Sequence, residues 1–170
     1  RYARRFLVVY YQNKRMVLNS IPRSSGAFDL IKQIKEETDM LISDQDAYQI
    51  YAAVGKTEKI EGDIAEVGVY KGGSSKLIRE ITKKPMHLFD TFEGLPDLCE
   101  HDNPEHFYKG EYSSSLENVK SYLRNYSNIS FYKGLFPFTA EPVKNKKFSF
   151  VHLDVDLYES TLNCLKFFYP

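Results

Sequence analysis

Acidic side chains follow three separate apolar runs of the sequence, and these carboxylates are the groups best suited to chemistry. Glu66 belongs to the segment EVGVYKGGSS, Asp90 ends MHLFD, and Asp154 and Asp156 follow His152 in HLDVD. In open α/β sheets, ligands bind outside the carboxyl ends of the strands, where the strand order reverses. We therefore expect these acids to gather at one edge of a sheet, around a ligand that presents hydroxyl groups, a positive charge or a metal ion.

The glycine-rich segment after Glu66 matches neither of the two common phosphate-binding loops. A P-loop needs a lysine directly after its glycine, but Ser74 follows the glycine pair here, and the glycine spacing also differs from the dinucleotide fingerprint. Gly68, Gly72, Gly73 and Ser74 instead predict a loop that opens a helix and lets the backbone approach a ligand. Backbone N–H groups at such a helix start can face the carboxylate of a zwitterionic amino acid, with Glu66 near its ammonium group.

Asp90 stands at the end of the next apolar run along the chain. Acids at this position of nucleotide-binding folds hold the hydroxyl groups of a ribose. The residues around it allow a second interpretation, in which Glu66, Gly68 and Asp90 form only structural turns with solvated acids.

The segment HLDVD carries the groups that could act on a bound substrate. His152, Asp154 and Asp156 alternate with apolar residues and share one side if the strand persists that far. Carboxylates suit a hard ion such as magnesium, and a carboxylate or a histidine can remove the proton of a hydroxyl nucleophile. Asp156 could instead be a supporting or helix-start acid, and His152 could be a hydrogen-bonded structural residue.

Strands that alternate with helices must position these residues. Short apolar runs predict strands, and helical spacing of apolar residues predicts helices, with Ser113 or Ser114 as the cap of the third helical region. The expected strands cover residues 64–69, 86–90, 129–132 and 148–155, and the expected helices fall within 27–53, 75–81, 115–126 and 160–168. This alternation predicts an α/β domain with a mainly parallel sheet and helices on both faces. We assign residues 1–55 to an N-terminal helical or cap segment and residues 56–170 to the ligand-binding α/β domain.

The composition limits the partners of this domain. The 170 residues include 23 basic and 23 acidic side chains, so the net charge of zero gives no electrostatic reason to expect nucleic acid or an anionic membrane. The apolar patch from Phe6 to Tyr11 is too short to span a bilayer. Cys99 and Cys164 form no CxxC pair, which favours a reducing, cytoplasmic setting. A small ligand is the expected partner, and the sequence allows a homo-oligomer.

Three blocks of the chain resemble one enzyme family when they are read together. GDIAEVGVYKGGSS, LFDTFEGLPD and FVHLDVDLYEST, in this order and spacing, are similar to the TylF/MycF/NovP group, the macrocin O-methyltransferase family, over roughly residues 39–170. The resemblance implies a class I methyltransferase (Rossmann-like) fold and S-adenosylmethionine as methyl donor. It also implies a divalent metal, usually Mg²⁺, and a hydroxyl of a sugar or similar small molecule as acceptor.

The same resemblance assigns roles to individual residues. It implies that Glu66, Gly68 and residues 72–74 bind the methionine half of S-adenosylmethionine, that Asp90 binds its ribose, and that Phe92 lies beside the adenosine. By the same resemblance the segment Asp39, Met40 and Leu41 could cover the site, and a packing role is the alternative interpretation.

Asp154 occupies the position of the first metal ligand in the family pattern. A cation held there would lower the pKa of an acceptor hydroxyl and fix the hydroxyl in line with the methyl group. The family pattern continues past Pro170 with a Gly-Gly pair, a strand and an acidic pair that completes the metal site. The sequence ends before these features, so we expect either that the region is missing here or that the protein is a degenerate relative without metal chemistry.

Two other functions compete with methyl transfer. Asp154-Val155-Asp156 is a DxD sequence after an apolar run, as in glycosyltransferases that hold a nucleotide sugar through a metal ion. The absent acidic pair would also fit a methyltransferase-like domain that is kept for binding or assembly.

A cluster of metal-binding residue types lies in the segment LCEHDNPEH. Cys99, His101, Asp102 and His106 match no standard zinc spacing. We interpret the segment as part of a polar lid that follows the second strand.

Overall fold

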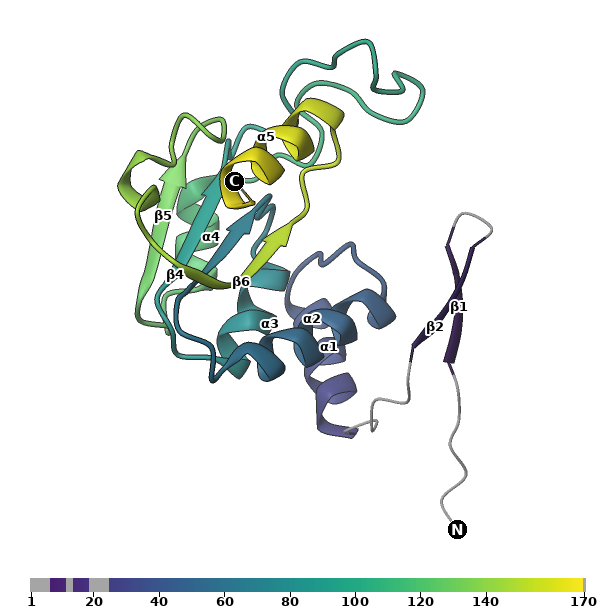
Figure 1. Ribbon diagram of the computed structural model, residues 1–170, viewed down its shortest axis with the longest axis vertical. Coiled ribbons are helices and arrows are strands. Elements are labelled where there is room, and N and C mark those ends of the chain that lie inside the picture. Colours follow the sequence, from purple (N-terminus) through teal and green to yellow (C-terminus); the bar gives the residue numbers. More distant parts are fainter. Residues whose placement is uncertain (1–6, 12–13, 19–24, 170) are drawn as a thin grey trace.

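Four parallel strands form the centre of the structure, a computed structural model that describes residues 7–11, 14–18 and 25–169 (Figure 1). The sheet has the order β5-β4-β3-β6, with β3 paired to β4 on one side and to β6 on the other. These strands are β3 (Asp63–Val67), β4 (Met86–Asp90), β5 (Ile129–Lys133) and β6 (Phe148–Leu153). Because the order reverses between β3 and β6, the carboxyl ends of these two strands form the switch point at which α/β folds bind ligands.

Helices cover both faces of this sheet, as the alternating pattern predicted. Ile64 and Leu88 point into one core with the first four helices, while Val67 and Phe89 point into a second core with the last helix. The first four helices are α1 (Ser25–Glu37), α2 (Asp44–Thr57), α3 (Gly73–Ile81) and α4 (Leu116–Tyr122), and the second core contains the short 3₁₀ helix η1 (Glu141–Val143) and α5 (Tyr158–Phe168). None of the helices in the described ranges is both long and apolar enough to cross a membrane.

Several boundaries differ from the expectations, and three of the differences matter here. Before residue 56 we expected only helices, but β1 (Leu7–Tyr11) and β2 (Lys14–Leu18) form an antiparallel hairpin ahead of α1 and α2. The cap of α4 is Ser115 rather than Ser113 or Ser114, because its hydroxyl accepts the backbone N–H of Asn118 at 3.1 Å. β6 ends at Leu153, so the two aspartates after it lie in a loop and not on the strand.

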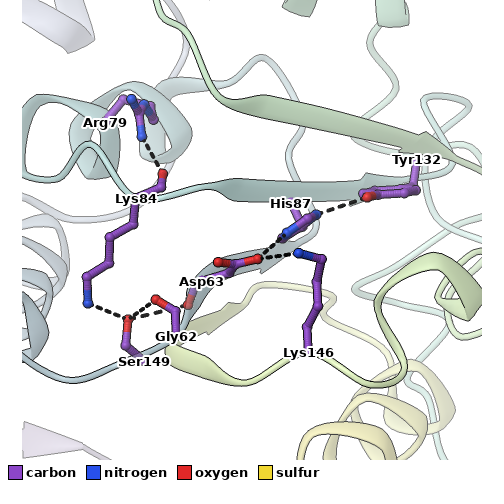
Figure 2. A network of polar contacts seen from close by, with 8 residues as sticks. All are labelled: Gly62, Asp63, Arg79, Lys84, His87, Tyr132, Lys146 and Ser149. Carbon is purple, nitrogen blue, oxygen red and sulfur yellow. Dashed lines mark hydrogen bonds and ion pairs between the residues drawn. The ribbon is translucent and has the colours of Figure 1, made fainter.

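A polar network connects β3, β4 and β5 at the end of the sheet that lies opposite the switch point (Figure 2). The imidazole of His87, 4% exposed on β4, lies 2.9 Å from Asp63 Oδ2 on β3 and 2.9 Å from the Tyr132 hydroxyl on β5. Lys146 donates to the same oxygen of Asp63 at 2.7 Å. Because both ring nitrogens of His87 have a partner on a neighbouring strand, the network stabilises the register of the three strands.

Loss of the Asp63 carboxylate is expected to destabilise the fold in a pH-dependent way. Burial acts to raise the pKa of Asp63, but hydrogen bonds from Lys146 and His87 outweigh it and hold the pKa below its ordinary value of 3.8. Asp63→Ala should lower the free energy of unfolding by about 2 kcal/mol at pH 7. The deficit should shrink as the pH falls below 3.8, because the wild-type carboxylate then becomes protonated.

Urea titrations at neutral and acidic pH measure this difference. Glu61→Ala is the control, because Glu61 forms only an exposed ion pair of 3.6 Å with Lys147, and its loss should cost less than about 0.5 kcal/mol. An Asp63→Ala deficit that does not depend on pH would show that the carboxylate charge does not stabilise the network.

Candidate functional site

A cavity of about 330 Å³ opens at the carboxyl ends of the strands, on the switch point between β3 and β6. This volume falls in the range of small-molecule sites. Its wall comes from the loops after β3, β4, β5 and β6, from the segment before α2, from the loop that precedes α4, and from α5. Six of the predicted site residues line it, and they are Gly68, Gly73, Ser74, Asp90, Asp154 and Asp156.

The cavity wall is strongly acidic. Five carboxylate residues line it, and the described lining residues include no lysine, arginine or histidine; the five are Asp39, Asp90, Glu111, Asp154 and Asp156. Burial raises the pKa of Asp154, and Asp46 adds to the effect. Burial also raises the pKa of Asp156, with further contributions from Asp154 and Glu111. Such a field favours a ligand that carries positive charge at its centre.

Asp90 organises the loop that follows β3. Its Oδ2 accepts the backbone N–H groups of Val69 at 2.6 Å and Tyr70 at 3.0 Å, and its Oδ1 accepts that of Phe92 at 2.7 Å. One carboxylate at the end of β4 therefore holds both loops of the cavity floor, while it remains part of the cavity wall. The backbone donors fix the position of this carboxylate before a ligand arrives.

Gly68 is required by a close approach of two backbones. Its φ of +88° is left-handed, and a Cβ at this position would lie 1.9 Å from the carbonyl oxygen of Asp154. The backbone N–H of Asp154 donates to Val67 at 2.9 Å, so the ends of β3 and β6 are joined at this point. The sequence predicted that Gly68 lets the backbone approach a ligand, whereas the group that lies against Gly68 in the structure is the backbone carbonyl of Asp154, just after β6.

The start of α3 is open toward the cavity. A Cβ at Gly73 would lie 2.7 Å from the Cβ of Met40, so the segment before α2 packs directly on the helix start. Gly73 and Ser74 line the cavity, and so do Asp39, Met40, Leu41 and Ile42. Gly72 lies behind the wall instead. Its φ is +82°, and a Cβ at this position would point toward Val119 of α4.

Glu66 lies beneath the cavity rather than on its wall. The side chain is fully buried, Oε2 accepts the hydroxyl of Ser75, and Oε1 has no hydrogen-bond partner in the described structure. Because β3 alternates its faces, Glu66 points toward α3, where it supports the helix start from below. Burial raises the pKa of Glu66 to about 8, against the lowering effect of Ser74 and Ser75.

Removal of this ionisable group is expected to stabilise the protein in alkaline solution. A carboxyl whose folded-state pKa is raised contributes stability below its ordinary pKa of 4.5, and that contribution is lost as the pH rises through about 8. Glu66→Gln should match the wild type at pH 4 and exceed its free energy of unfolding by on the order of 4 kcal/mol at pH 9.

Chemical denaturation at the two pH values tests this expectation. Glu105→Gln makes the same chemical change at an exposed loop position and should show no pH-dependent difference from the wild type. A wild-type protein that is no less stable than Glu66→Gln at pH 9 would contradict a raised pKa at Glu66.

His152 and the two aspartates after it separate in the structure. His152 pairs in register with Glu66 and does not line the cavity, and burial lowers its pKa to about 4. Its Nε2 has no hydrogen-bond partner among the described residues and lies 4.0 Å from Asp154 Oδ2. Asp154 and Asp156 both face the cavity, the latter with a left-handed φ of 56° in the turn into α5. Of the three residues that were predicted to share one side, only Asp154 and Asp156 therefore lie together at the cavity.

Phe92 was expected beside an adenosine, but its side chain lies in the core with α4 and is 5% exposed. It does not line the cavity. Its φ of 55° turns the backbone at the end of β4, so its contribution is to the shape of the loop.

No group of three or more histidine, cysteine, aspartate or glutamate side chains is placed to hold a metal ion in the part of the chain that the structure describes. Asp154 and Asp156 alone therefore do not make a complete metal site. The segment with Cys99, His101 and His106 also forms no such group.

Several residues of the cavity were not singled out from the sequence. Glu111 and Tyr112 reach the cavity from the loop before α4, and the Tyr112 ring meets the ring of Tyr70 edge-on at 6.0 Å. Both tyrosines have left-handed backbones, with φ values of 50° and 59°. No periodic pattern in the sequence identifies these residues as part of a site. Only the length of the polar loop distinguished this region.

The comparisons with known proteins agree with this fold. Residues 42–170 match the family described as Macrocin-O-methyltransferase (TylF). Demethyldecarbamoylnovobiocin O-methyltransferase of Streptomyces niveus is 29% identical over 132 residues, which cover 65% of this chain and 48% of that protein. 8-demethyl-8-(2,3-dimethoxy-alpha-L-rhamnosyl)-tetracenomycin-C 4'-O-methyltransferase of Streptomyces olivaceus is 28% identical over 127 residues, which cover 65% of this chain and 49% of that protein.

Solved structures give the same result. The O-methyltransferase NovP superposes with a TM-score of 0.63 at 27% identity, over 76% of this chain and 61% of NovP. The calicheamicin methyltransferase CalS11 superposes with a TM-score of 0.64 at 17% identity, over 90% of this chain and 75% of CalS11, and shows the fold alone. The chain spans about half the length of the curated relatives it matches. Its match over most of its length places the chain in the macrocin O-methyltransferase (TylF) family, with a class I methyltransferase fold.

Proposed function

We propose that this chain binds S-adenosylmethionine in the acidic cavity and serves an O-methyltransferase that acts on a hydroxyl of a sugar or small natural product. The observation that carries the proposal is the wall of five carboxylates next to the open start of α3, of which only Asp39 has a lysine partner, Lys71, among the described residues. S-adenosylmethionine carries a sulfonium charge, an ammonium group and ribose hydroxyls, and each of these is complementary to carboxylates.

The residues of the cavity fit the parts of this cofactor. Gly73 and Ser74 at the start of α3 present backbone N–H groups of the kind that hold a carboxylate, and no side chain of Gly68 obstructs the floor. Asp90 is held by three backbone donors and keeps lone pairs for the ribose hydroxyls. Glu66, Gly72 and Phe92 support this arrangement from behind the wall and do not make its first contacts.

The proposed reaction needs an acceptor hydroxyl that loses a proton as it is methylated. The bound cofactor supplies a methyl group that its sulfonium makes electrophilic. Asp154 and Asp156 are the carboxylates at the open end of β6, and the raised pKa of each makes it a better proton acceptor than an ordinary aspartate. We assign the proton transfer to Asp154, whose pKa is raised by burial and by Asp46, with Asp156 as the neighbouring acid.

The assignment of Mg²⁺ depends on residues beyond the described ones. Asp154 has a side chain that is 46% exposed, so it is accessible as one oxygen ligand for a divalent cation. The described residues supply no complete ligand set, so any further ligands would come from elsewhere in the protein or from the acceptor.

We also propose that the chain divides at residue 56 into two functional parts. Residues 56–170 would provide the cofactor site, and the segment before residue 56 would act as a cap. The cap role is supported by four residues of the segment before residue 56 that line the cavity: Asp39, Met40, Leu41 and Ile42.

Two relatives guide the choice of acceptor. Their names describe O-methylation of demethyldecarbamoylnovobiocin and of a rhamnosyl-tetracenomycin. The acidic wall and its exposed apolar rim, with Leu41 at 65% and Leu135 at 41% exposure, suit an uncharged sugar on an apolar body. A phosphorylated acceptor would meet like charges, which disfavours the competing role as a glycosyltransferase for nucleotide sugars.

A methyl-transfer assay on the complete natural protein tests this proposal. Incubation with methyl-labelled S-adenosylmethionine and a panel of neutral deoxysugar glycosides should give a product heavier by one methyl group, detected by mass spectrometry. Transfer of a sugar from a nucleotide sugar, with no methylated product from any glycoside, would reverse the assignment.

A further inference from the structure

The loop between β4 and α4 is closed at its base. The backbone N–H of Leu95 donates to Glu111 at 2.8 Å, and that of Gly110 donates back to Leu95 at 2.9 Å. A Cβ at Gly94 would lie 2.3 Å from the carbonyl oxygen of Gly110, so the two ends of the loop are in direct contact. Residues 95–110 therefore form a compact loop whose neck leads straight into the cavity residues Glu111 and Tyr112.

One side chain joins the far part of this loop to α5. Asp102 accepts the backbone N–H of Tyr158 through Oδ1 at 2.8 Å and that of Cys99 through Oδ2 at 2.8 Å. These two backbone hydrogen bonds lower the pKa of Asp102. The ring of His101 lies 4.6 Å from the ring of Tyr158 and adds a second contact. Figure 1 shows the loop beside the first turn of α5.

Helix α5 has no cap of its own. Leu157 occupies its N-cap position and makes no side-chain cap hydrogen bond. An aspartate that accepts an N-terminal N–H of a helix stabilises that helix, both as a hydrogen-bond acceptor and as a negative charge at the positive end of the helix dipole. Asp102 therefore caps α5 from a distant loop, and separation of the loop from α5 would uncap the helix.

The same contact connects two walls of the cavity. Asp156 lies two residues before Tyr158, in a left-handed turn that faces the cavity. Glu111 and Tyr112 reach the cavity from the neck of the loop. We propose that Asp102 is a positioning residue, which holds the 95–110 loop against α5 and thereby fixes Asp156 opposite Glu111 and Tyr112. Its effect on methyl transfer rests on the function proposed above, whereas its hold on the loop does not.

Limited proteolysis tests the hold on the loop without any ligand. Lys109 is an exposed residue of the loop, so trypsin cleavage after Lys109 reports on release of the loop. Asp102→Ala should be cleaved there about five- to thirtyfold faster than wild type, which is the range that loss of one helix cap permits. Asp102→Asn keeps one acceptor oxygen and should be intermediate. Cleavage after Lys120, within α4, should stay slow in all variants, which separates loop release from unfolding of the whole chain.

Glu105→Ala is the matched control, because it removes a carboxylate from the same loop at an exposed position. It should be cleaved at the wild-type rate. Wild-type cleavage after Lys109 in Asp102→Ala would overturn the proposal.

Methyl transfer by the complete natural protein supplies the second readout. Asp102→Ala should lower kcat/KM for the acceptor at least about tenfold, and Asp102→Asn should recover part of the loss, at a temperature where all variants are folded. Faster proteolysis with unchanged kcat/KM would overturn the positioning role and leave the proposed function intact. Absence of methyl transfer in the unchanged protein would count against the proposed function, while the cleavage rates would still decide whether Asp102 holds the loop.

Discussion

Asp154→Asn is expected to reduce methyl transfer by about 10²- to 10⁴-fold, the usual contribution of a positioned acid or base. Asparagine has nearly the shape of aspartate but accepts no proton at neutral pH. The backbone of Asp154 should be unaffected, because its N–H donates to Val67 at 2.9 Å independently of the side chain. Binding of S-adenosylhomocysteine should therefore change only a few-fold.

Initial rates of methyl transfer and calorimetric binding of S-adenosylhomocysteine, measured on the same preparations, separate the two effects. Asp29→Asn is the control, because it makes the same substitution at an exposed position of α1. Asp29→Asn should keep wild-type rates. Turnover near the wild-type rate in Asp154→Asn would remove Asp154 from the reaction.

Gly68→Ala is expected to be the most damaging single substitution for the fold of the site. The new Cβ would lie 1.9 Å from the Asp154 carbonyl oxygen, and alanine would also have to adopt a φ of +88°. Both effects push β3 and β6 apart at the switch point. The free energy of unfolding should fall by at least about 3 kcal/mol, and binding of S-adenosylhomocysteine should be lost even where the protein still folds.

Gly55→Ala provides a direct comparison within the same chain. Gly55 lies in α2, and a Cβ there would meet no heavy atom within 4 Å. This substitution should be neutral or should stabilise the helix by about 0.5–1 kcal/mol. Thermal unfolding monitored by circular dichroism distinguishes the two variants, and a Gly68→Ala protein with wild-type stability and affinity would show that the contact with Asp154 is not required.

The sequence predicted the part of the site that depends on strand order. Asp90 and Asp154 follow apolar strands, and parallel strands bring their carboxyl ends to one edge, so chain position was enough to bring these acids together. The same logic explains why Glu66 did not reach the cavity wall. It lies one position inside the end of β3, where the alternation of side chains directs it toward α3.

Other features depend on loop conformation and could not be predicted from spacing. Tyr70, Tyr112 and Asp156 adopt left-handed backbones that the residue types do not require. Glu111 reaches the cavity only because the neck of the 95–110 loop closes between Leu95 and Gly110. Asp102 had been grouped with cysteine and histidine residues, yet its partners are backbone N–H groups of a distant helix and its own loop.

The central claim, a site for S-adenosylmethionine among these carboxylates, is tested most directly by isothermal titration calorimetry of S-adenosylhomocysteine and S-adenosylmethionine into this chain. We predict saturable binding at one site in the wild type. We also predict that Asp90→Ala, which removes the acceptor of three backbone hydrogen bonds, binds neither compound. A folded wild-type protein that binds neither compound, or an Asp90→Ala variant that binds both with unchanged affinity, would contradict the claim.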